Sequence, residues 1–219
     1  MILAGRGLNQ ELKDHLVDLK KNSNIKVHLI ELDILDFHSH KIFFDSIINK
    51  PIGVISFIGL TDNQVSSDSN LEDKKVIINT NFLGIVNLME IFINDFKKRS
   101  IPGWVMAVSS IAAERGGIRN NIYACSKAAL NTYLEGKRIS LKSYNIKVIT
   151  IILGIVDTRM IKGASYPKWL ISNPYSVARA MYKTQQSSMQ ISFIPKYWRF
   201  LMFIVRHLPI RVYLKLIKS

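Results

Sequence analysis

The chain has 219 residues, of which 48% are hydrophobic, so it can bury one sizeable core and is not a disordered chain. It carries a formal charge of +14, from 30 Lys and Arg against 16 Asp and Glu. A single cysteine excludes an internal disulfide, and the charged residues near the start exclude a secretory signal, so we expect a cytoplasmic protein.

The positive charge gathers in the C-terminal third. No Asp or Glu follows Asp157, whereas eleven Lys and Arg do, which leaves +3 (14 − 11) for residues 1–157. No nucleic-acid recognition motif accompanies these cations, so we expect no nucleic acid partner. The asymmetry instead indicates that the C-terminal segment contacts some other surface.

Short apolar runs alternate with segments of helical periodicity along the chain. Strands are predicted at 1–6, 26–32, 53–59, 104–108 and 147–153. Helices are predicted at 10–21, 38–49, 71–98 and 124–141, and a polar loop at 61–70. Apolar strands that alternate with helices over short connections predict an α/β fold with a doubly wound parallel sheet.

Three polar residues follow the fourth predicted strand. Ser110 comes just after its end, where open α/β sheets place their chemistry, and Tyr123 and Lys127 are four residues apart near the start of a helix. A phenol has a pKa of about 10, and a neighbouring ammonium lowers that pKa toward the range useful for proton transfer. With Ser110 holding the substrate oxygen, the trio suits protonation of a carbonyl oxygen while a cofactor supplies hydride. An ordinary strand, loop and helix with a Tyr–Lys surface pair is the alternative.

A Ser followed thirteen residues later by Tyr-x-x-x-Lys resembles the active-site motif of the short-chain dehydrogenases/reductases. The order of strands and helices is similar to that family over nearly the whole chain. The resemblance implies an NAD(P)-dependent oxidoreductase with Ser110, Tyr123 and Lys127 as catalytic residues. It also implies that Asn81, in the stretch 79–84, is the fourth catalytic residue and holds a water in a proton relay.

The same resemblance implies a cofactor site. Arg6 stands where the family selects its cofactor, and an Arg there can pair with the 2′-phosphate, so NADP is favoured over NAD. The alternative for Arg6 is a solvated loop cation. Asp33 is matched to a contact with the adenine, with a helix N-cap as its alternative. The other cofactor-binding residues that the resemblance implies are Ile34, Gly59, Tyr123, Lys127, Gly154, Val156 and Thr158.

Three features depart from the family pattern. The glycine-rich first strand and turn that hold the pyrophosphate are missing from the sequence, and the pair Gly5 and Gly7 does not replace them. The turn at 56–59 carries bulky residues, and Leu153 replaces a proline before Gly154. We therefore expect a Rossmann-like sheet that lacks the first strand and helix and has a gap between two strands.

Residues 196–219 are predicted to form a basic amphipathic tail on a truncated Rossmann-type domain of residues 1–195. Lys196, Arg199 and Arg206 fall near one helix face, and further basic residues repeat at helical spacing after Pro209. Such a helix fits an anionic membrane surface, with packing on the protein or on a second subunit as the alternative. The membrane interpretation predicts a cytoplasmic protein in peripheral contact with the inner face of the membrane.

The stretches 108–117, 133–136 and 193–202 resemble a subgroup that includes the bacterial decaprenylphosphoryl-ribose 2-keto reductases. This resemblance implies a sugar or a lipid-linked sugar as the substrate, and the family implies a homo-oligomer formed through the long helices. Two functions stay open: an NADP(H)-dependent oxidoreductase that interconverts a hydroxyl and a ketone, and a non-catalytic remnant that binds a membrane surface or a partner. Neither Cys125 nor the histidines show metal-ligand spacing, so no metal is expected.

Overall fold

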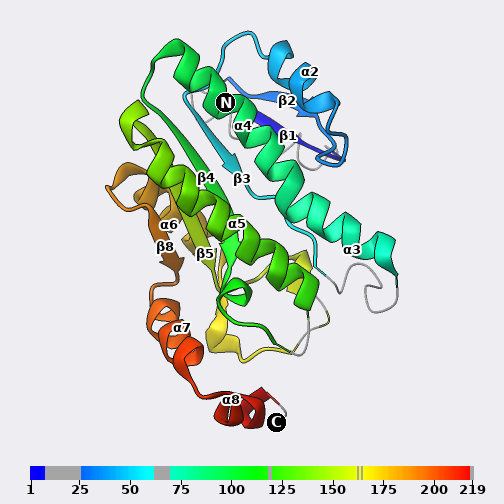
Figure 1. Ribbon diagram of the computed structural model, residues 1–219, viewed down its shortest axis with the longest axis vertical. Helices are drawn as coiled ribbons and strands as arrows, with labels where there is room; N and C mark the ends of the chain where they lie inside the picture. The colour runs from blue at the N-terminus through cyan, green and yellow to red at the C-terminus, as the bar shows by residue number, and fades with distance from the viewer. Residues whose placement is uncertain (8–25, 62–69, 118–119, 162, 164, 218–219) are drawn as a thin grey trace.

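The structure, a computed structural model, describes residues 1–7, 26–61, 70–117, 120–161, 163 and 165–217 (Figure 1). The helix predicted at 10–21 and most of the loop predicted at 61–70 lie outside these residues. Every strand pair in the described part of the chain is parallel, so the predicted α/β class with a parallel sheet is confirmed.

The larger sheet has four strands in the order β3-β4-β5-β8. Its members are β3 (Gly53–Ser56), β4 (Gly103–Ser110), β5 (Ile146–Leu153) and β8 (Ile191–Ile194). β4 and β5 pair over their full lengths, from Gly103 opposite Ile146 to Ser110 opposite Leu153. Both are continuous apolar runs, as expected for parallel strands covered on both faces.

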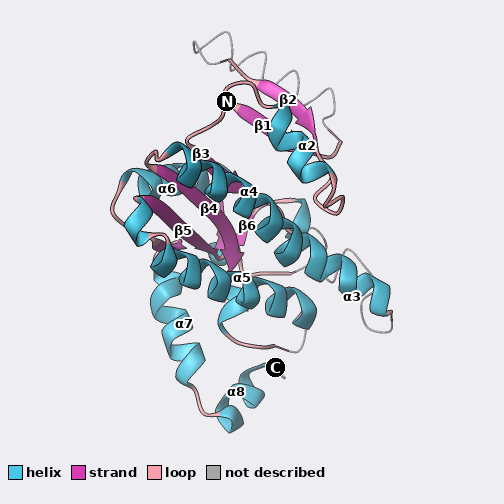
Figure 2. Cartoon of the chain, turned by 45° about the horizontal axis from the view of Figure 1, so that its top comes forward, coloured by secondary structure: helices cyan, strands magenta, loops and turns pink. Residues whose placement is uncertain are grey.

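A separate two-stranded sheet is formed by β1 (Ile2–Gly5) and β2 (His28–Glu31). No described strand lies between β1 and β3, and Figure 2 shows β1 and β2 apart from the larger sheet. The order β2-β1, a gap, then β3-β4-β5 matches a Rossmann sheet with its first strand left out. The gap predicted from the sequence is therefore present among the described residues.

Helices cover both faces of the larger sheet. The described α-helices are α2 (Ser39–Ser46), α3 (Leu71–Ile78), α4 (Gly84–Arg99), α5 (Asn121–Ser140), α6 (Pro174–Gln186), α7 (Tyr197–His207) and α8 (Ile210–Ile217). Val105 and Val148 pack with α4 and α5 on one face, whereas Met106 and Ile149 pack with Val177 of α6 on the other. Successive side chains of a strand therefore pack into two hydrophobic cores, one on each face of the sheet. Because helices cover both faces, the sheet is doubly wound.

The predicted long helix is one continuous rod of three segments. α3 and α4 are joined by a π-helical turn, Asn79–Leu83, and the rod runs from Leu71 to Arg99. By length and composition this rod could cross a membrane, but Ile85, Met89 and Phe96 are buried in the core. It therefore packs as the core helix of a globular domain.

Some bounds differ from the predicted ones. β3 ends at Ser56 instead of residue 59, and α5 begins at Asn121, so Tyr123 lies within the helix. α6 and β8 were not predicted, although Asn173 caps α6 and Pro174 occupies its first turn. Two short strands, β6 (Ile155–Val156) and β7 (Ile171–Ser172), pair beyond the end of β5.

Candidate active site

The catalytic candidates meet at the carboxyl ends of β3 and β4. Ser110 is the last residue of β4, and its Oγ accepts a hydrogen bond from the Ala112 amide at 3.1 Å. This bond turns the chain into the short 3-10 helix at Ile111–Glu114. The Ser110 side chain also hydrogen-bonds the phenol of Tyr123, so the structure brings together two residues that are thirteen positions apart.

Lys127 lies one helical turn after Tyr123 on the same face of α5, as predicted. Its Nζ lies 6.0 Å from the centre of the Tyr123 ring. The same ammonium donates to the carbonyl oxygens of Ile58 and Val108, each at 3.0 Å, and so ties the ends of β3 and β4 together. The Lys127 residue is only 2% exposed.

The electrostatics differ from the expectation. Burial raises the pKa of the Tyr123 phenol above its usual value, and the hydrogen bond from Ser110 lowers it only in part. Burial also lowers the pKa of the Lys127 ammonium to about 8. The prediction that Lys127 pulls the phenol's pKa down is therefore not what this geometry gives, because desolvation outweighs every stabilisation of the phenolate. Tyr123 holds its proton at neutral pH.

Asn81 lies in the π-helical turn and is completely buried. Its Oδ1 accepts from the Leu60 amide at 2.7 Å, and its Nδ2 donates to the Leu60 carbonyl at 2.8 Å and to the Ser126 Oγ at 3.0 Å. Ser126 in turn donates to the Tyr123 carbonyl at 2.6 Å. The Asn81 side chain therefore positions the loop after β3 against the helix that carries Tyr123.

Ser126 is a residue that sequence reasoning missed. It is fully buried, and it links Asn81 to the backbone of Tyr123. The available signal was a serine between Tyr123 and Lys127 on the inner side of a helix, where a buried hydroxyl needs partners.

In the separate two-stranded sheet, Arg6 comes directly after β1 and Asp33 comes two residues after β2. The Arg6 Nη1 and the Asp33 Oδ2 are 3.7 Å apart, and both side chains are well exposed. Glu31 accepts a hydrogen bond from the Gly7 amide at 2.9 Å. The sequence contains no acidic residue between Gly5 and Gly7, but folding brings the Glu31 carboxylate to this turn, and sequence reasoning did not find it.

Of two further cofactor candidates, Ile34 packs in the core and Gly59 lies beside Lys127. Ile34 is 6% exposed, and its side chain lies where a Cβ on Gly84 would be, at 2.6 Å, so it packs on α4. Its carbonyl also contacts His40 at 3.1 Å. Gly59 lies beside Lys127, since a Cβ placed on it would be 3.6 Å from the Lys127 Nζ.

The turn after β5 carries the last cofactor candidates. Gly154 packs so closely on Trp198 of α7 that a Cβ would lie 1.9 Å from the indole nitrogen. Val156 is half-buried in β6 and packs on the core beneath α6. Thr158 is exposed, and its hydroxyl donates to the Val156 carbonyl at 3.3 Å.

A dinucleotide fits these residues at its two ends. Arg6 and Asp33 suit an adenosine bearing a 2′-phosphate, and Lys127, Gly154 and Thr158 suit the nicotinamide half. Among the described residues, no glycine-rich turn opens a helix at the gap between β1 and β3, where a pyrophosphate would lie. The described groups therefore suit the two ends of a dinucleotide and offer no site for its pyrophosphate.

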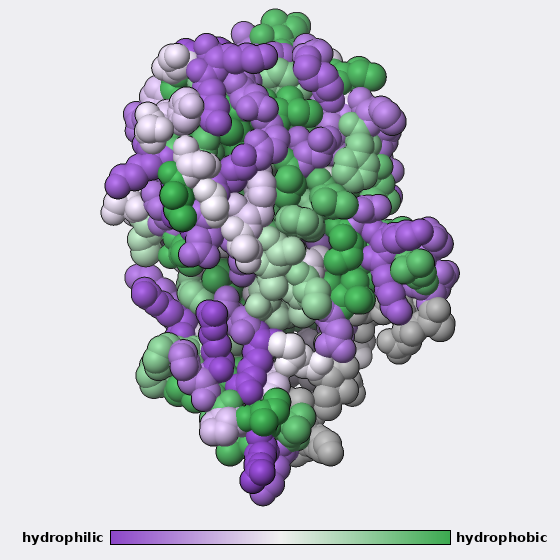
Figure 3. Space-filling view, in the orientation of Figure 1, coloured by the Kyte–Doolittle hydropathy of each residue, from purple (hydrophilic) through white to green (hydrophobic). Residues whose placement is uncertain are grey.

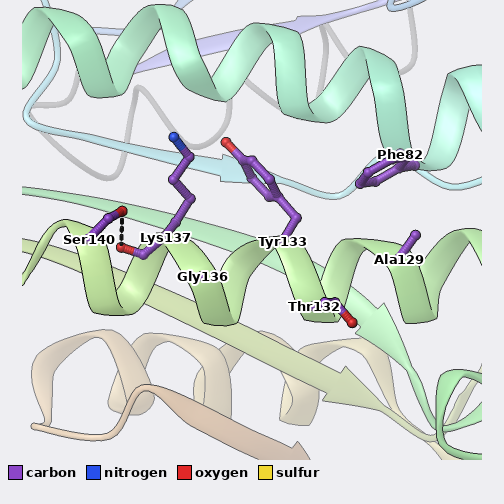
Figure 4. A pocket seen from close by; sticks show the side chains of 7 residues that line it. All are labelled: Phe82, Ala129, Thr132, Tyr133, Gly136, Lys137 and Ser140. Carbon is purple, nitrogen blue, oxygen red and sulfur yellow. Dashed lines mark hydrogen bonds between the residues drawn. The ribbon is translucent and has the colours of Figure 1, made fainter.

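A shallow groove between α4 and α5 lies away from these groups. Figure 4 shows Tyr133 and Lys137 of α5 reaching toward α4, where both meet Glu90. The remaining lining residues include Phe82 and Ala129, and Tyr123 is not among them. No three His, Cys, Asp or Glu side chains of the described residues are grouped as a metal site.

A family model described as short chain dehydrogenase matches residues 2–168. The chain belongs to the short-chain dehydrogenase family. The short-chain dehydrogenase match includes Ser110, Tyr123 and Lys127 and spans three quarters of the sequence. The protein is thus by family an NAD(P)-dependent oxidoreductase.

Relatives and solved structures agree with this family. An uncharacterized oxidoreductase of Mycobacterium tuberculosis (strain ATCC 25618 / H37Rv) is 26% identical over 213 residues, which are 95% of this chain and 84% of that protein. A 3-oxoacyl-[acyl-carrier-protein] reductase of Chlamydia muridarum is 28% identical over 171 residues, which are 74% of this chain and 63% of that protein. The fold of this short-chain dehydrogenase is similar to that of one from Burkholderia cenocepacia J2315, whose structure is a complex with NADP. The TM-score is 0.74 at 20% identity, covering 94% of this chain and 93% of that one.

Proposed function

We propose that this short-chain dehydrogenase interconverts a hydroxyl group and a ketone with NADP(H). The observation that carries the proposal is the hydrogen bond between the Ser110 side chain and the phenol of the half-buried Tyr123, with Lys127 one turn away. In this arrangement Ser110 orients the substrate oxygen, and Tyr123 gives a proton to that oxygen or takes one from it. When bound, the nicotinamide supplies or accepts the hydride.

Two further residues, Lys127 and Asn81, support this proton transfer. Lys127 keeps a positive charge below pH 8 beside the phenol and orients the cofactor's ribose. Asn81 positions the Tyr123 helix through Ser126 and supports the proton relay. A relay through Asn81 uses its backbone carbonyl or the remaining lone pair of its side chain, because the side chain already makes three hydrogen bonds.

NADP is proposed over NAD because the exposed Arg6 guanidinium lies at the end of β1 beside Asp33. An exposed guanidinium can pair with a 2′-phosphate in two parallel hydrogen bonds. Glu31 at the same turn accepts a hydrogen bond from the Gly7 amide with one carboxylate oxygen, and Arg6 is the cationic group that the turn offers to a 2′-phosphate.

The substrate class proposed is a sugar or a lipid-linked sugar, on the resemblance of residues 108–117 and 193–202 to the polyprenyl-phosphate-sugar keto reductases. A protein with that substrate is expected in the cytoplasm and at the inner membrane face, with peripheral contact through residues 196–219. We also propose a homo-oligomer that forms through α4 and α5, whose groove at Tyr133 and Lys137 is open to a second copy.

The second candidate function is a non-catalytic protein that binds a membrane surface or a partner. It is favoured by the unpaired edges of β1 and β3, between which no described residue holds a pyrophosphate. Titration of the purified chain with NADPH and with NADH, followed by fluorescence or calorimetry, separates the two. Saturable binding that is tighter for NADPH, together with turnover of keto sugars, is expected. Absence of saturable binding for both nucleotides contradicts the oxidoreductase and favours the second candidate.

A further inference from the structure

The two C-terminal helices are attached to the loop that follows Ser110. The Arg115 guanidinium donates to the Val205 carbonyl of α7 and lies 3.9 Å from the centre of the Tyr213 ring of α8. The Tyr213 hydroxyl donates to the Gly116 carbonyl at 2.7 Å. Both helices are therefore held by consecutive residues of the loop.

A further ion pair joins the same elements. Arg206 of α7 lies 3.9 Å from Glu114, whose side chain is mostly covered. Burial raises the pKa of the Glu114 carboxyl, and the Arg206 guanidinium lowers it in part. We call the contacts of Glu114, Arg115 and Gly116 with α7 and α8 the latch.

The inner face of α7 is also fixed. Trp198 and Met202 are buried, and Trp198 packs on Gly154 at the end of β5. Figure 1 shows both helices beyond the carboxyl ends of the strands, where the candidate active site lies. The helices and the site thus share one end of the molecule.

The outer faces of α7 and α8 are apolar and basic at once. Their exposed apolar side chains are Tyr197, Phe200, Phe203, Ile204, Ile210, Val212, Leu214 and Leu216. Their exposed basic side chains are Lys196, Arg199, Arg206, Arg211 and Lys215. Figure 3 shows hydrophobic and strongly hydrophilic residues side by side at this end of the molecule.

A groove runs between α7 and the latch. Phe193, Phe200 and Phe203 give it apolar walls, and Lys196, Arg199 and Arg206 surround it with positive charge. The Glu114 carboxylate also lines the groove and is paired with Arg206. Apolar walls beneath a cationic rim suit acyl chains beneath an anionic headgroup.

The positive charge of α7 and α8 favours an anionic lipid surface over a second copy of the chain as the partner of this surface. No acidic residue follows Asp157, so a second copy placed face to face would bring the basic side chains of both chains together. An anionic lipid surface accepts the same side chains, while the aromatic and aliphatic residues enter the boundary between headgroups and acyl chains. Each basic residue near such a surface adds about 1 kcal/mol of attraction.

We propose that α7 and α8 dock the protein on an anionic lipid membrane, and that the latch holds the loop after Ser110 at the lipid surface. The active site then opens toward lipid-linked substrates. This last step rests on the proposed oxidoreductase function, whereas the docking itself does not require catalysis.

Docking is tested by sedimentation of the full chain with vesicles, without cofactor or substrate. Vesicles of phosphatidylcholine with a quarter of phosphatidylglycerol are expected to bind the chain in a salt-sensitive manner, and pure phosphatidylcholine vesicles only weakly. Arg211→Glu with Lys215→Glu is expected to weaken this binding about tenfold or more. Lys98→Glu with Lys142→Glu, on exposed positions of α4 and the loop after α5, is the matched charge control and should bind within a few-fold of wild type.

The apolar contribution is tested with Phe200→Ser and Phe203→Ser, compared with Ile42→Ser, a similarly exposed isoleucine in helix α2. The Phe variants should lose vesicle binding with unchanged circular dichroism and sedimentation coefficient in solution. Docking is contradicted if the wild-type chain does not bind anionic vesicles. It is also contradicted if the Phe variants dissociate an oligomer in solution, because a second copy of the chain then covers this surface.

The latch is tested with an environment-sensitive dye on Gly116→Cys in a Cys125→Ser background. The matched control is Gly136→Cys, because neither glycine has an atom within 4 Å of an added Cβ. Anionic vesicles should shift the emission of the dye at position 116 to shorter wavelength and leave the dye at 136 unchanged. No shift at 116 under conditions of full vesicle binding contradicts the placement of the loop at the lipid.

Discussion

The indole of Trp198 fills the space that a Cβ on Gly154 would occupy. The indole nitrogen lies 1.9 Å from that position, and Trp198 is 4% exposed. A residue of the C-terminal tail therefore closes the turn after β5, where the resemblance places the nicotinamide. The tail and the candidate active site are consequently parts of one packing unit.

Gly154→Ala is expected to destabilise the protein by about 2 kcal/mol, because an added methyl group in a packed site forces the indole aside. Urea unfolding measures the change, and Trp198 fluorescence should shift toward that of an exposed indole. Trp198→Phe in the Gly154→Ala background should recover part of the loss. Gly136→Ala is the control, since it adds a methyl in open space within a helix and should stabilise by about 1 kcal/mol. Equal stability of Gly154→Ala and wild type would show that α7 moves freely.

Tyr123→Phe is expected to lower turnover by about 10²- to 10⁴-fold, the usual contribution of a positioned acid or base. NADPH affinity should stay within a few-fold of wild type, because the phenol hydroxyl is removed and the ring remains. Tyr175→Phe, at an exposed position of α6, is the matched control. A Tyr123→Phe variant that keeps most of its turnover rules out the assigned proton transfer.

The Lys127 ammonium is expected to titrate near pH 8 in NMR spectra of the chain with labelled lysine. Below pH 8 it is charged in both the folded and the unfolded state. Between pH 8 and 10.5 only the unfolded state keeps the proton, so stability rises with pH. Relative to Lys127→Met, wild type should gain about 3 kcal/mol over this window, from a pKa difference of about 2.5. A lysine titration at its ordinary pKa would contradict the desolvated position.

Asn81→Ala is expected to cost about 3 kcal/mol, because the Leu60 amide and carbonyl and the Ser126 hydroxyl lose their partner. Denaturant unfolding measures the loss. Asn94→Ala, on the exposed side of α4, is the control and should change stability by less than about 0.5 kcal/mol. Similar stability of both variants would show that Asn81 does not hold the loop after β3.

His40 is expected to make stability pH-dependent. It is fully buried, and its Nε2 donates to the Ile34 carbonyl while its Nδ1 accepts from the Asn87 amide group. Burial lowers the pKa of the His40 ring below its usual 6.5. The unfolded state therefore takes up the proton first, and stability falls as pH drops below about 6.5. His40→Gln should flatten this slope, whereas His28→Gln, at an exposed position, should leave it unchanged.

The fold was predictable where apolar runs are long. The segments around 104–108 and 147–153 contain no charge in their centres, which predicts buried parallel strands, and both are such strands. The end of β3 was not predictable, because Ile58 leaves the sheet to offer its carbonyl to Lys127 from another part of the chain. α6 was not predicted, although Asn173 and Pro174 are typical of a helix N-terminus. The polar residues of its exposed face interrupt the apolar periodicity.

The sequence predicted the spacing of the candidate catalytic residues, but not how deeply their side chains are buried. Tyr123 and Lys127 are four positions apart, a spacing that places both on one helix face, and the structure confirms this. The direction of the Tyr123 pKa was wrong, because the burial of both side chains depends on strands distant in sequence. The bond from Glu31 to Gly7 likewise joins two strands and leaves no local pattern.

The π-helical turn at Asn79–Leu83 has a consequence for length variation in this helix. Each of its backbone bonds reaches one residue further than in an α-helix, so the turn accommodates one additional residue. Deleting a single residue there would restore a uniform α-helical repeat. The residues before the turn would keep nearly the same orientation relative to α4, because five π-helical residues and four α-helical residues turn the chain through nearly the same angle. Ile77 would therefore stay in the core, and the change would fall on the turn itself, which carries Asn81 and its two hydrogen bonds to Leu60.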